Sequence, residues 1–198
     1  MAFRILLSLV CVVALAAPAM AAPITYVAYL SGPNESPANA SPGTGFAEVT
    51  IDDVLHSMQV NVTFQGLTAP NTAAHIHVIN GPGDANTADT LGPVATTTPT
   101  FTGFPSGTAG VYSQIFNMTL ASSYRAGFIT DSGGTTALAE LALFSGIADG
   151  RAYLNIHTGN FPGGEIRGFL QPVPEPGTLL LLGSGIAGLV RMRRRQRS

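Results

Sequence analysis

The strict alternation of apolar and polar residues over residues 58–65 constrains the fold of this chain more than any other feature. The apolar positions are Met58, Val60, Val62 and Phe64. Successive side chains of a β-strand point to opposite faces, so this period of two predicts a strand with one buried and one hydrated face. Residues 46–51 alternate in the same way, and Asp, His and Ser residues separate the two runs. The pattern predicts a β-hairpin over residues 45–65.

Five more short strands are expected, because alternating or β-branched runs recur between turns rich in Gly, Pro and Asn. They cover residues 24–31, 73–79, 111–120, 152–158 and 165–171. One helix is expected over residues 136–147, where Leu138 and Leu141 lie near helical spacing. The long segment 80–110 has no apolar period and is interpreted as a functional or mobile loop.

These elements predict an all-β domain over residues 22–172, with the fold of an antiparallel β-sandwich or a barrel-like domain and one short helix. An N-terminal signal peptide and a C-terminal membrane-anchor helix are expected to flank it. The length of the domain is sufficient for a substantial core. That core is predicted to include Ile51, Val60, Val62, Phe64, Ile76, Ile156 and Ile166.

Residues 1–21 carry the three parts of a secretory signal peptide. Arg4 supplies the positive start, residues 5–17 form the apolar run, and Ala19-Met20-Ala21 is the small-x-small pattern that signal peptidase cleaves. The run is too short for a comfortable membrane span, which needs about 20 residues. The only cysteine, Cys11, lies in this run, so the exported domain is expected to fold without a disulfide.

Residues 173–198 combine a proline-flanked motif, an apolar segment and an arginine cluster, in that order. The motif is Val173, Pro174, Glu175 and Pro176, and the cluster includes Arg191, Arg193, Arg194 and Arg195. A helix formed by the apolar residues 177–190 would be only ~21 Å long, against about 30 Å of bilayer hydrocarbon. The arginines hold the C-terminus in the cytoplasm by the positive-inside rule. The segment is therefore predicted to be a temporary anchor for a domain that lies outside the inner membrane.

The charge of the domain argues against nucleic acids as partners. It contains no lysine and only Arg125, Arg151 and Arg167, against ten carboxylates, which gives a formal charge of −7. Binding to nucleic acid or to anionic lipid requires a basic patch, so neither partner is expected. No Ser/His/Asp triad, phosphate loop or pair of catalytic carboxylates is visible in the sequence either. The protein is interpreted as non-enzymatic.

Three of the four histidines lie in predicted strands and could meet on one face. His75 and His77 are two residues apart, so their side chains project from the same side of a strand. Asn155 and His157 share one side of a later strand by the same rule. If the two strands are neighbours, the three imidazoles converge beside the 80–110 loop.

Two interpretations of these histidines stay open. In the first, they bind copper or zinc, because imidazole is a common ligand of both ions and three histidines leave one coordination position open. Asn155, Glu165 and Arg167 would then orient the ligands from a second layer. In the second, the same side chains form a polar network across the strands, with Glu165 and Arg167 as a local ion pair.

Two stretches of the chain carry a family resemblance. They are Ala73-Ala74-His75-Ile76-His77, and Tyr153 to Thr158 followed by Phe161-Pro162-Gly163-Gly164-Glu165-Ile166-Arg167-Gly168. Both resemble the CHRD (chordin-domain) family, and the resemblance extends over residues 24–171. It implies an extracellular β domain, as in chordin, an antagonist of growth factors. The order of the histidines is also similar to that of Cu/Zn superoxide dismutase, which implies a redox alternative.

The C-terminal motif, apolar segment and arginines resemble the PEP-CTERM sorting tail. That resemblance implies a processing enzyme of the exosortase type, in a bacterium that makes extracellular polysaccharide. The expected function is that of a secreted, non-enzymatic structural or binding component of the cell surface or the polysaccharide matrix. The alternative is a metal-binding (copper or zinc) or redox protein built on His75, His77 and His157.

Overall fold

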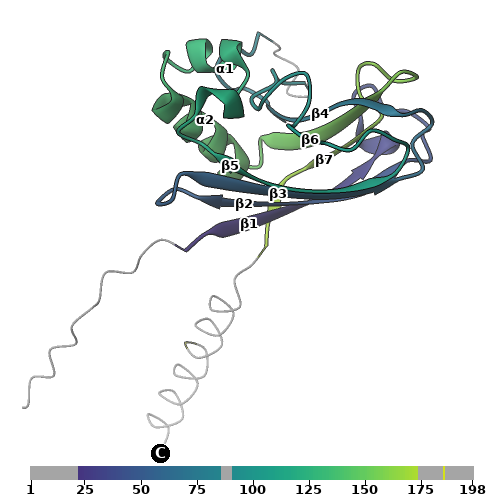
Figure 1. Cartoon of the computed structure of the whole chain (residues 1–198), viewed down its shortest axis with the longest axis horizontal. Helices are drawn as coiled ribbons and strands as arrows, with labels where there is room; N and C mark the ends of the chain where they lie inside the picture. The colour runs from purple at the N-terminus through teal and green to yellow at the C-terminus, as the bar shows by residue number, and fades with distance from the viewer. Residues whose placement is uncertain (1–21, 86–90, 174–184, 186–198) are drawn as a thin grey trace, which may run out of the picture.

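A computed structural model describes residues 22–85, 91–173 and 185 (Figure 1). They form one antiparallel sheet in the spatial order β4-β6-β7-β1-β2-β3-β5, and the short strand β8 pairs with β1. The strands are β1 (Ile24–Ser31), β2 (Thr44–Asp52), β3 (Ser57–Gln65), β4 (Asn71–Val78), β5 (Gly110–Asn117), β6 (Ala152–Thr158), β7 (Ile166–Phe169) and β8 (Gln171–Pro172).

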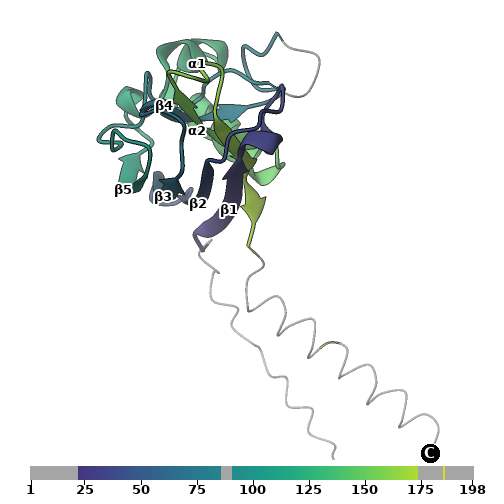
Figure 2. The ribbon, with the colours of Figure 1, turned by 90° about the vertical axis from the view of Figure 1, so that its right-hand side faces the viewer.

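The sheet curls into a half-barrel, and two helices lie over its inner side (Figures 1 and 2). Figure 2 shows β5, β3, β2 and β1 side by side beneath α1 (Ala126–Asp131) and α2 (Thr136–Ala148). The prediction of an all-β, antiparallel, barrel-like domain is confirmed. Every residue predicted for the core is buried: Ile51, Val60, Val62, Phe64, Ile76, Ile156 and Ile166.

The hairpin of β2 and β3 forms as the alternation predicts. Val49 pairs with Val60 and Ala47 with Val62, so the apolar side chains of both strands meet on the inner face. The turn between the strands is held by Asp52, whose carboxylate accepts hydrogen bonds from the backbone N–H groups of Val54 and Leu55 at 3.0 and 2.8 Å. The turn at Asp52 and the alternation of apolar and polar residues, both of which are local in the sequence, therefore explain this hairpin.

The helix α2 forms where it was expected, but the two leucines whose spacing suggested it do not face the core. Leu138 and Leu141 are exposed, whereas Leu143 and Ile147 are fully buried. The helix is apolar on most of its circumference, so the spacing of two leucines does not select the packed face. Its contacts with β4 and β6 decide the face instead, and Gly146 lies directly against Val78.

The 80–110 segment is anchored to the domain at a few points: Ala95, Thr96 and Phe101 are fully buried, whereas its other described residues are partly or fully exposed. Phe101 is fully buried against Tyr112 and Phe116, with ring centroids at 6.0 and 5.5 Å. The backbone N–H of Ala95 donates to the carbonyl oxygen of Ile76 at 2.9 Å, so the segment also covers the open edge of β4.

The predicted signal peptide lies outside the described residues, and so does the anchor segment 177–190 except for Gly185. Among the residues that the structure describes, no helix is both long and apolar enough to cross a bilayer. The two points where the chain leaves the domain are close together, because the N–H of Val173 donates to the carbonyl oxygen of Thr25 at 2.9 Å.

Candidate functional site

The order of the strands brings the three predicted histidines onto one stretch of sheet. β4 pairs with β6, which places Ala73 opposite His157 and His75 opposite Asn155. β6 then pairs with β7, which places Asn155 opposite Arg167. These side chains lie on the outer face, opposite the core residues of the same strands.

The three imidazoles converge. One nitrogen from each of His75, His77 and His157 lies within 4.8 Å of the others. The ring centroid of His75 is 4.7 Å from those of both partners, and the centroids of His77 and His157 are 6.1 Å apart. His75 and His77 are buried, whereas His157 is partly exposed and forms the solvent side of the cluster.

Backbone carbonyls orient two of the rings. Nδ1 of His77 lies 2.8 Å from the carbonyl oxygen of Gly92, and Nδ1 of His157 lies 2.9 Å from that of Pro162. A carbonyl oxygen only accepts, so each Nδ1 carries the hydrogen. In a neutral imidazole Nε2 then has a free lone pair. Both Nε2 atoms are buried and have no hydrogen-bond partner among the described residues.

The surroundings keep these histidines neutral. Burial, followed by the neighbouring His77 and His157, lowers the pKa of His75 to about 3. Burial lowers the pKa of His77 to about 4, with a smaller contribution from the charges of Arg167 and Arg125. Burial also lowers the pKa of His157. The cluster therefore offers neutral nitrogen ligands at neutral pH.

A stack of side chains supports the cluster from β6 and β7. The ring of Tyr153 lies parallel to that of His77, with centroids 4.7 Å apart. The guanidinium carbon of Arg167 lies 4.8 Å from the centroid of the same tyrosine. Arg167 also forms a buried ion pair with Glu35, with Nε 3.8 Å from Oε2. Burial raises the pKa of Glu35 to about 7, against the opposing charge of Arg167.

Glu165, which was expected to orient a ligand histidine from a second layer, has other hydrogen-bond partners in the structure. Its carboxylate accepts hydrogen bonds from the hydroxyl groups of Ser41, Thr68 and Thr158 and from the N–H of Thr68, at 2.5–3.1 Å. Burial alone would raise the pKa of Glu165, but these bonds together hold it below its usual range. The carboxylate thus joins three loops, and the ion pair that the structure gives Arg167 is with Glu35 rather than Glu165.

Comparison with protein families agrees with this architecture. The CHRD domain model matches residues 26–170, nearly three quarters of the chain. The chain belongs to the CHRD family. The model of the PEP-CTERM protein-sorting motif matches residues 172–195. A search of curated proteins and a search of solved structures returned no match.

The sorting motif determines where the CHRD domain acts. The protein is exported, is anchored transiently in the membrane, is processed by an exosortase, and then lies at the cell surface or outside the cell. CHRD domains are in general non-enzymatic. The matched motif begins at Pro172, the last residue of β8, and continues with Val173.

The sequence assigned no role in the site to three of its contributors: Glu35, Gly92 and Pro162. Pro162 lies in the stretch that resembles the CHRD family, but Gly92 and Pro162 act through backbone carbonyls, which the residue type does not reveal. Gly164, in the stretch that resembles the CHRD family, lies against this support layer: a Cβ on it would lie 2.7 Å from Oε1 of Glu35 and 2.6 Å from Nδ2 of Asn155. A side chain at this position would therefore disturb the support of the cluster.

The fourth histidine, His56, lies away from the cluster. Its Nδ1 is 2.9 Å from Oε1 of Glu140, which joins the β2–β3 turn to helix α2. His56 is thus a histidine with an assigned structural partner, and it serves as a natural control for the other three.

Proposed function

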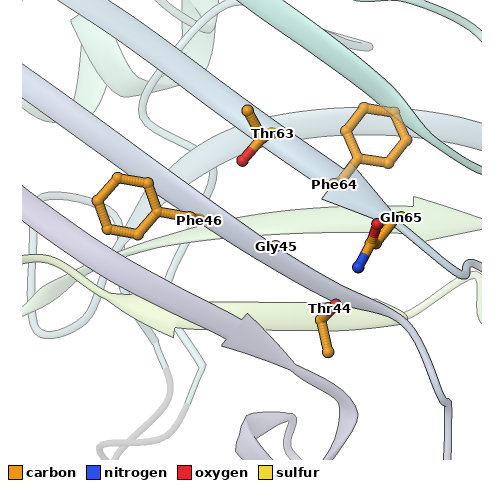
Figure 3. Close-up of a pocket in the computed structure, with 6 residues that line it drawn as sticks. All are labelled: Thr44, Gly45, Phe46, Thr63, Phe64 and Gln65. Atoms are coloured by element: carbon orange, nitrogen blue, oxygen red, sulfur yellow. The ribbon is translucent and has the colours of Figure 1, made fainter.

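We propose that the protein is a non-enzymatic binding component of the cell surface or extracellular matrix, which contacts polysaccharide through the outer face of β2, β3 and β5. The observation that carries this proposal is a polar and aromatic surface on that face. A hollow of about 330 Å³ lies along the paired ends of β2 and β3 (Figure 3). Its lining residues are Thr44, Gly45, Phe46, Thr63, Phe64 and Gln65.

The surface continues beyond this hollow. A second hollow of about 260 Å³ shares Phe46 and Thr63 and adds the polar side chains of Glu48, Asn61 and Ser113. Asn61 joins the three polar residues, because it donates to Glu48 at 3.2 Å and accepts from Ser113 at 2.7 Å. The ring of Phe46 packs against that of the exposed Tyr29, with centroids 5.2 Å apart.

This chemistry suits a sugar chain. The C–H face of a sugar ring packs on aromatic rings, and its hydroxyl groups exchange hydrogen bonds with amide, hydroxyl and carboxylate groups. Among the described residues that line the two hollows, Glu48 is the one ionisable carboxylate, and none is a histidine or a cysteine. The net negative charge of the domain disfavours strongly anionic polymers, so the proposed ligand is a neutral polysaccharide.

Affinity electrophoresis of the mature protein through gels that contain a neutral polysaccharide, or the exopolysaccharide of the producing cell, tests this function. The Phe46→Ala variant is expected to bind at least tenfold more weakly than the wild type. Leu141→Ala is the control, because Leu141 is an exposed apolar side chain on α2 that lines neither hollow. Equal retardation of the wild type and a Phe46→Ala/Asn61→Ala double variant would contradict the proposal.

A further inference from the structure

We propose that His75, His77 and His157 form a binding site for one copper or zinc ion. The site lies on β4 and β6, at the opposite end of the strand order from the β2–β3 hollows, so it is independent of polysaccharide contact. The proposed ligand, a divalent transition-metal ion, belongs to a different chemical class from the polysaccharide proposed above.

The distribution of unpaired polar atoms distinguishes a ligand site from a polar network. Among the described residues, six buried side-chain atoms have no hydrogen-bond partner, and five of them lie in or beside this cluster. They are Nδ1 of His75, Nε2 of His77, Nε2 of His157, Oδ1 of Asn155 and Oε1 of Glu35. Nε2 of His77, Nε2 of His157 and the two oxygens are all acceptors, so they cannot satisfy one another as the members of a closed polar network do. His75 and His77 are only 6% and 9% exposed, so solvent does not readily replace the missing partners.

The unpaired nitrogens are also held in the orientation that a metal ion requires. The hydrogen bonds from Nδ1 to Gly92 and Pro162 hold the rings of His77 and His157 and leave Nε2 as the ligand atom. This arrangement, in which the second nitrogen of a ligand histidine donates to a carbonyl, is the usual support of metal-binding histidines. Stacking on Tyr153 restrains the ring of His77 further.

The spacing fits after a small closure. Metal–nitrogen bonds of ~2.0–2.1 Å in tetrahedral geometry place ligand nitrogens about 3.3 Å apart. The nitrogens of this cluster are within 4.8 Å of one another, so binding requires them to approach one another by at most about 1.5 Å. Three ligands leave one coordination position open on the solvent side.

The donor set selects the class of metal. Three imidazole nitrogens suit zinc and copper, whereas calcium and magnesium prefer oxygen ligands. Arg167, in the support layer, is paired with the carboxyl group of Glu35 at 3.8 Å and lies over the ring of Tyr153.

Metal analysis of the mature protein tests the site. Protein stripped with a chelator is loaded with Cu²⁺ or Zn²⁺, passed through a desalting column and analysed by mass spectrometry for metal content. We expect about one ion per chain for the wild type, and at least tenfold weaker binding for His157→Gln and for His77→Gln. Isothermal titration with each metal, and competition between them, then identifies the preferred ion. Bound Cu²⁺ is expected to show nitrogen couplings in its electron paramagnetic resonance spectrum.

His56→Gln is the matched control, because it removes a histidine whose partner is Glu140. It is expected to retain the full metal content. Circular dichroism of each stripped variant checks the fold, and if His77→Gln fails to fold, the partly exposed His157→Gln decides. Metal content below a tenth of an equivalent in the wild type would overturn the site. So would equal affinity in the wild type and His157→Gln, or an equal loss in His56→Gln.

Discussion

The β2–β3 hairpin and the β4–β6 pair follow the same alternating pattern, yet their polar faces differ. In β3 the polar positions Gln59, Asn61 and Thr63 are partly or fully exposed. In β6 the corresponding positions Tyr153 and Asn155 are buried together with the apolar ones. Polar side chains on a hydrated face are ordinary in antiparallel sheets, whereas buried ones require partners. The comparison identifies the histidine face as the exceptional one.

Loops cause the difference. The segment around Gly92 and the turn around Pro162 each contribute a carbonyl oxygen to a histidine, and Glu35 and Ser41 reach β7 from the segment between β1 and β2. No comparable loop covers the outer face of the β2–β3 hairpin within the described residues, and its side chains stay available for an external ligand. Burial by loops thus converts one polar face into an interior site.

The largest effect is expected where a charge enters the inner face of the hairpin. Val60→Asp places an unpaired carboxylate in the core, which should lower the free energy of unfolding by about 3–5 kcal/mol. Urea denaturation measures it. Thr63→Asp, on the exposed face of the same strand, should cost less than about 1 kcal/mol. Equal losses for the two variants would show that the two faces are not distinct.

The next largest effect is expected when the buried carboxylate of Glu165 is compared with that of Glu48, on the outer face of the β2–β3 hairpin. Glu165→Ala removes the acceptor of four hydrogen bonds in a buried site, so we expect a loss of about 2–4 kcal/mol. Glu48→Ala removes the acceptor of one side-chain bond on the hydrated face and should cost less than about 1 kcal/mol. Thermal or urea unfolding near pH 7 measures both losses of stability. A loss for Glu48→Ala as large as that for Glu165→Ala would contradict the difference between the buried and the hydrated carboxylate.

The smallest effect concerns pH. The pKa values of His75 and His77 are lowered from 6.5 to about 3 and about 4, so the unfolded chain takes up protons below pH 6.5 that the folded chain does not. Their contribution to stability is full above pH 6.5 and is lost as the pH falls toward these values. Glu35 acts in the opposite direction, because its raised pKa of about 7 gives stability below pH 4.5 that is lost as the pH rises through 7.

The balance predicts that stability falls by about 1–2 kcal/mol between pH 7.5 and 5.5 with a chelator present, because two or three histidines outweigh one carboxyl. Glu35→Gln should make this fall larger, since it removes the opposing contribution. Urea titrations at the two pH values measure both. Stability of the Glu35→Gln variant that rises as the pH falls would contradict the lowered pKa values of the buried histidines.

Local patterns in the sequence predicted much of the fold. The period of two assigned the inner and outer residues of β2, β3, β4 and β6, because the backbone geometry of a strand alone decides which side chains share a face. It therefore predicted that His75 and His77 project together. The spacing of Leu138 and Leu141 predicted the helix α2 but not its packed face, because a helix that is apolar on most sides does not show which side packs.

The two terminal signals and the shared faces of the histidine pair are properties of the sequence by itself, since each depends on residues that are close together in the chain. Only the tertiary structure decided that β6 lies between β4 and β7, and that Gly92, Pro162 and Glu35 surround the cluster. Strand order depends on which apolar faces bury one another across more than 70 residues, and loop carbonyls act without regard to side-chain identity. Neither leaves a periodic trace in the sequence, so the sequence could predict the convergence of three imidazoles only on the condition that the two strands are neighbours, and the pairing of β4 with β6 met that condition.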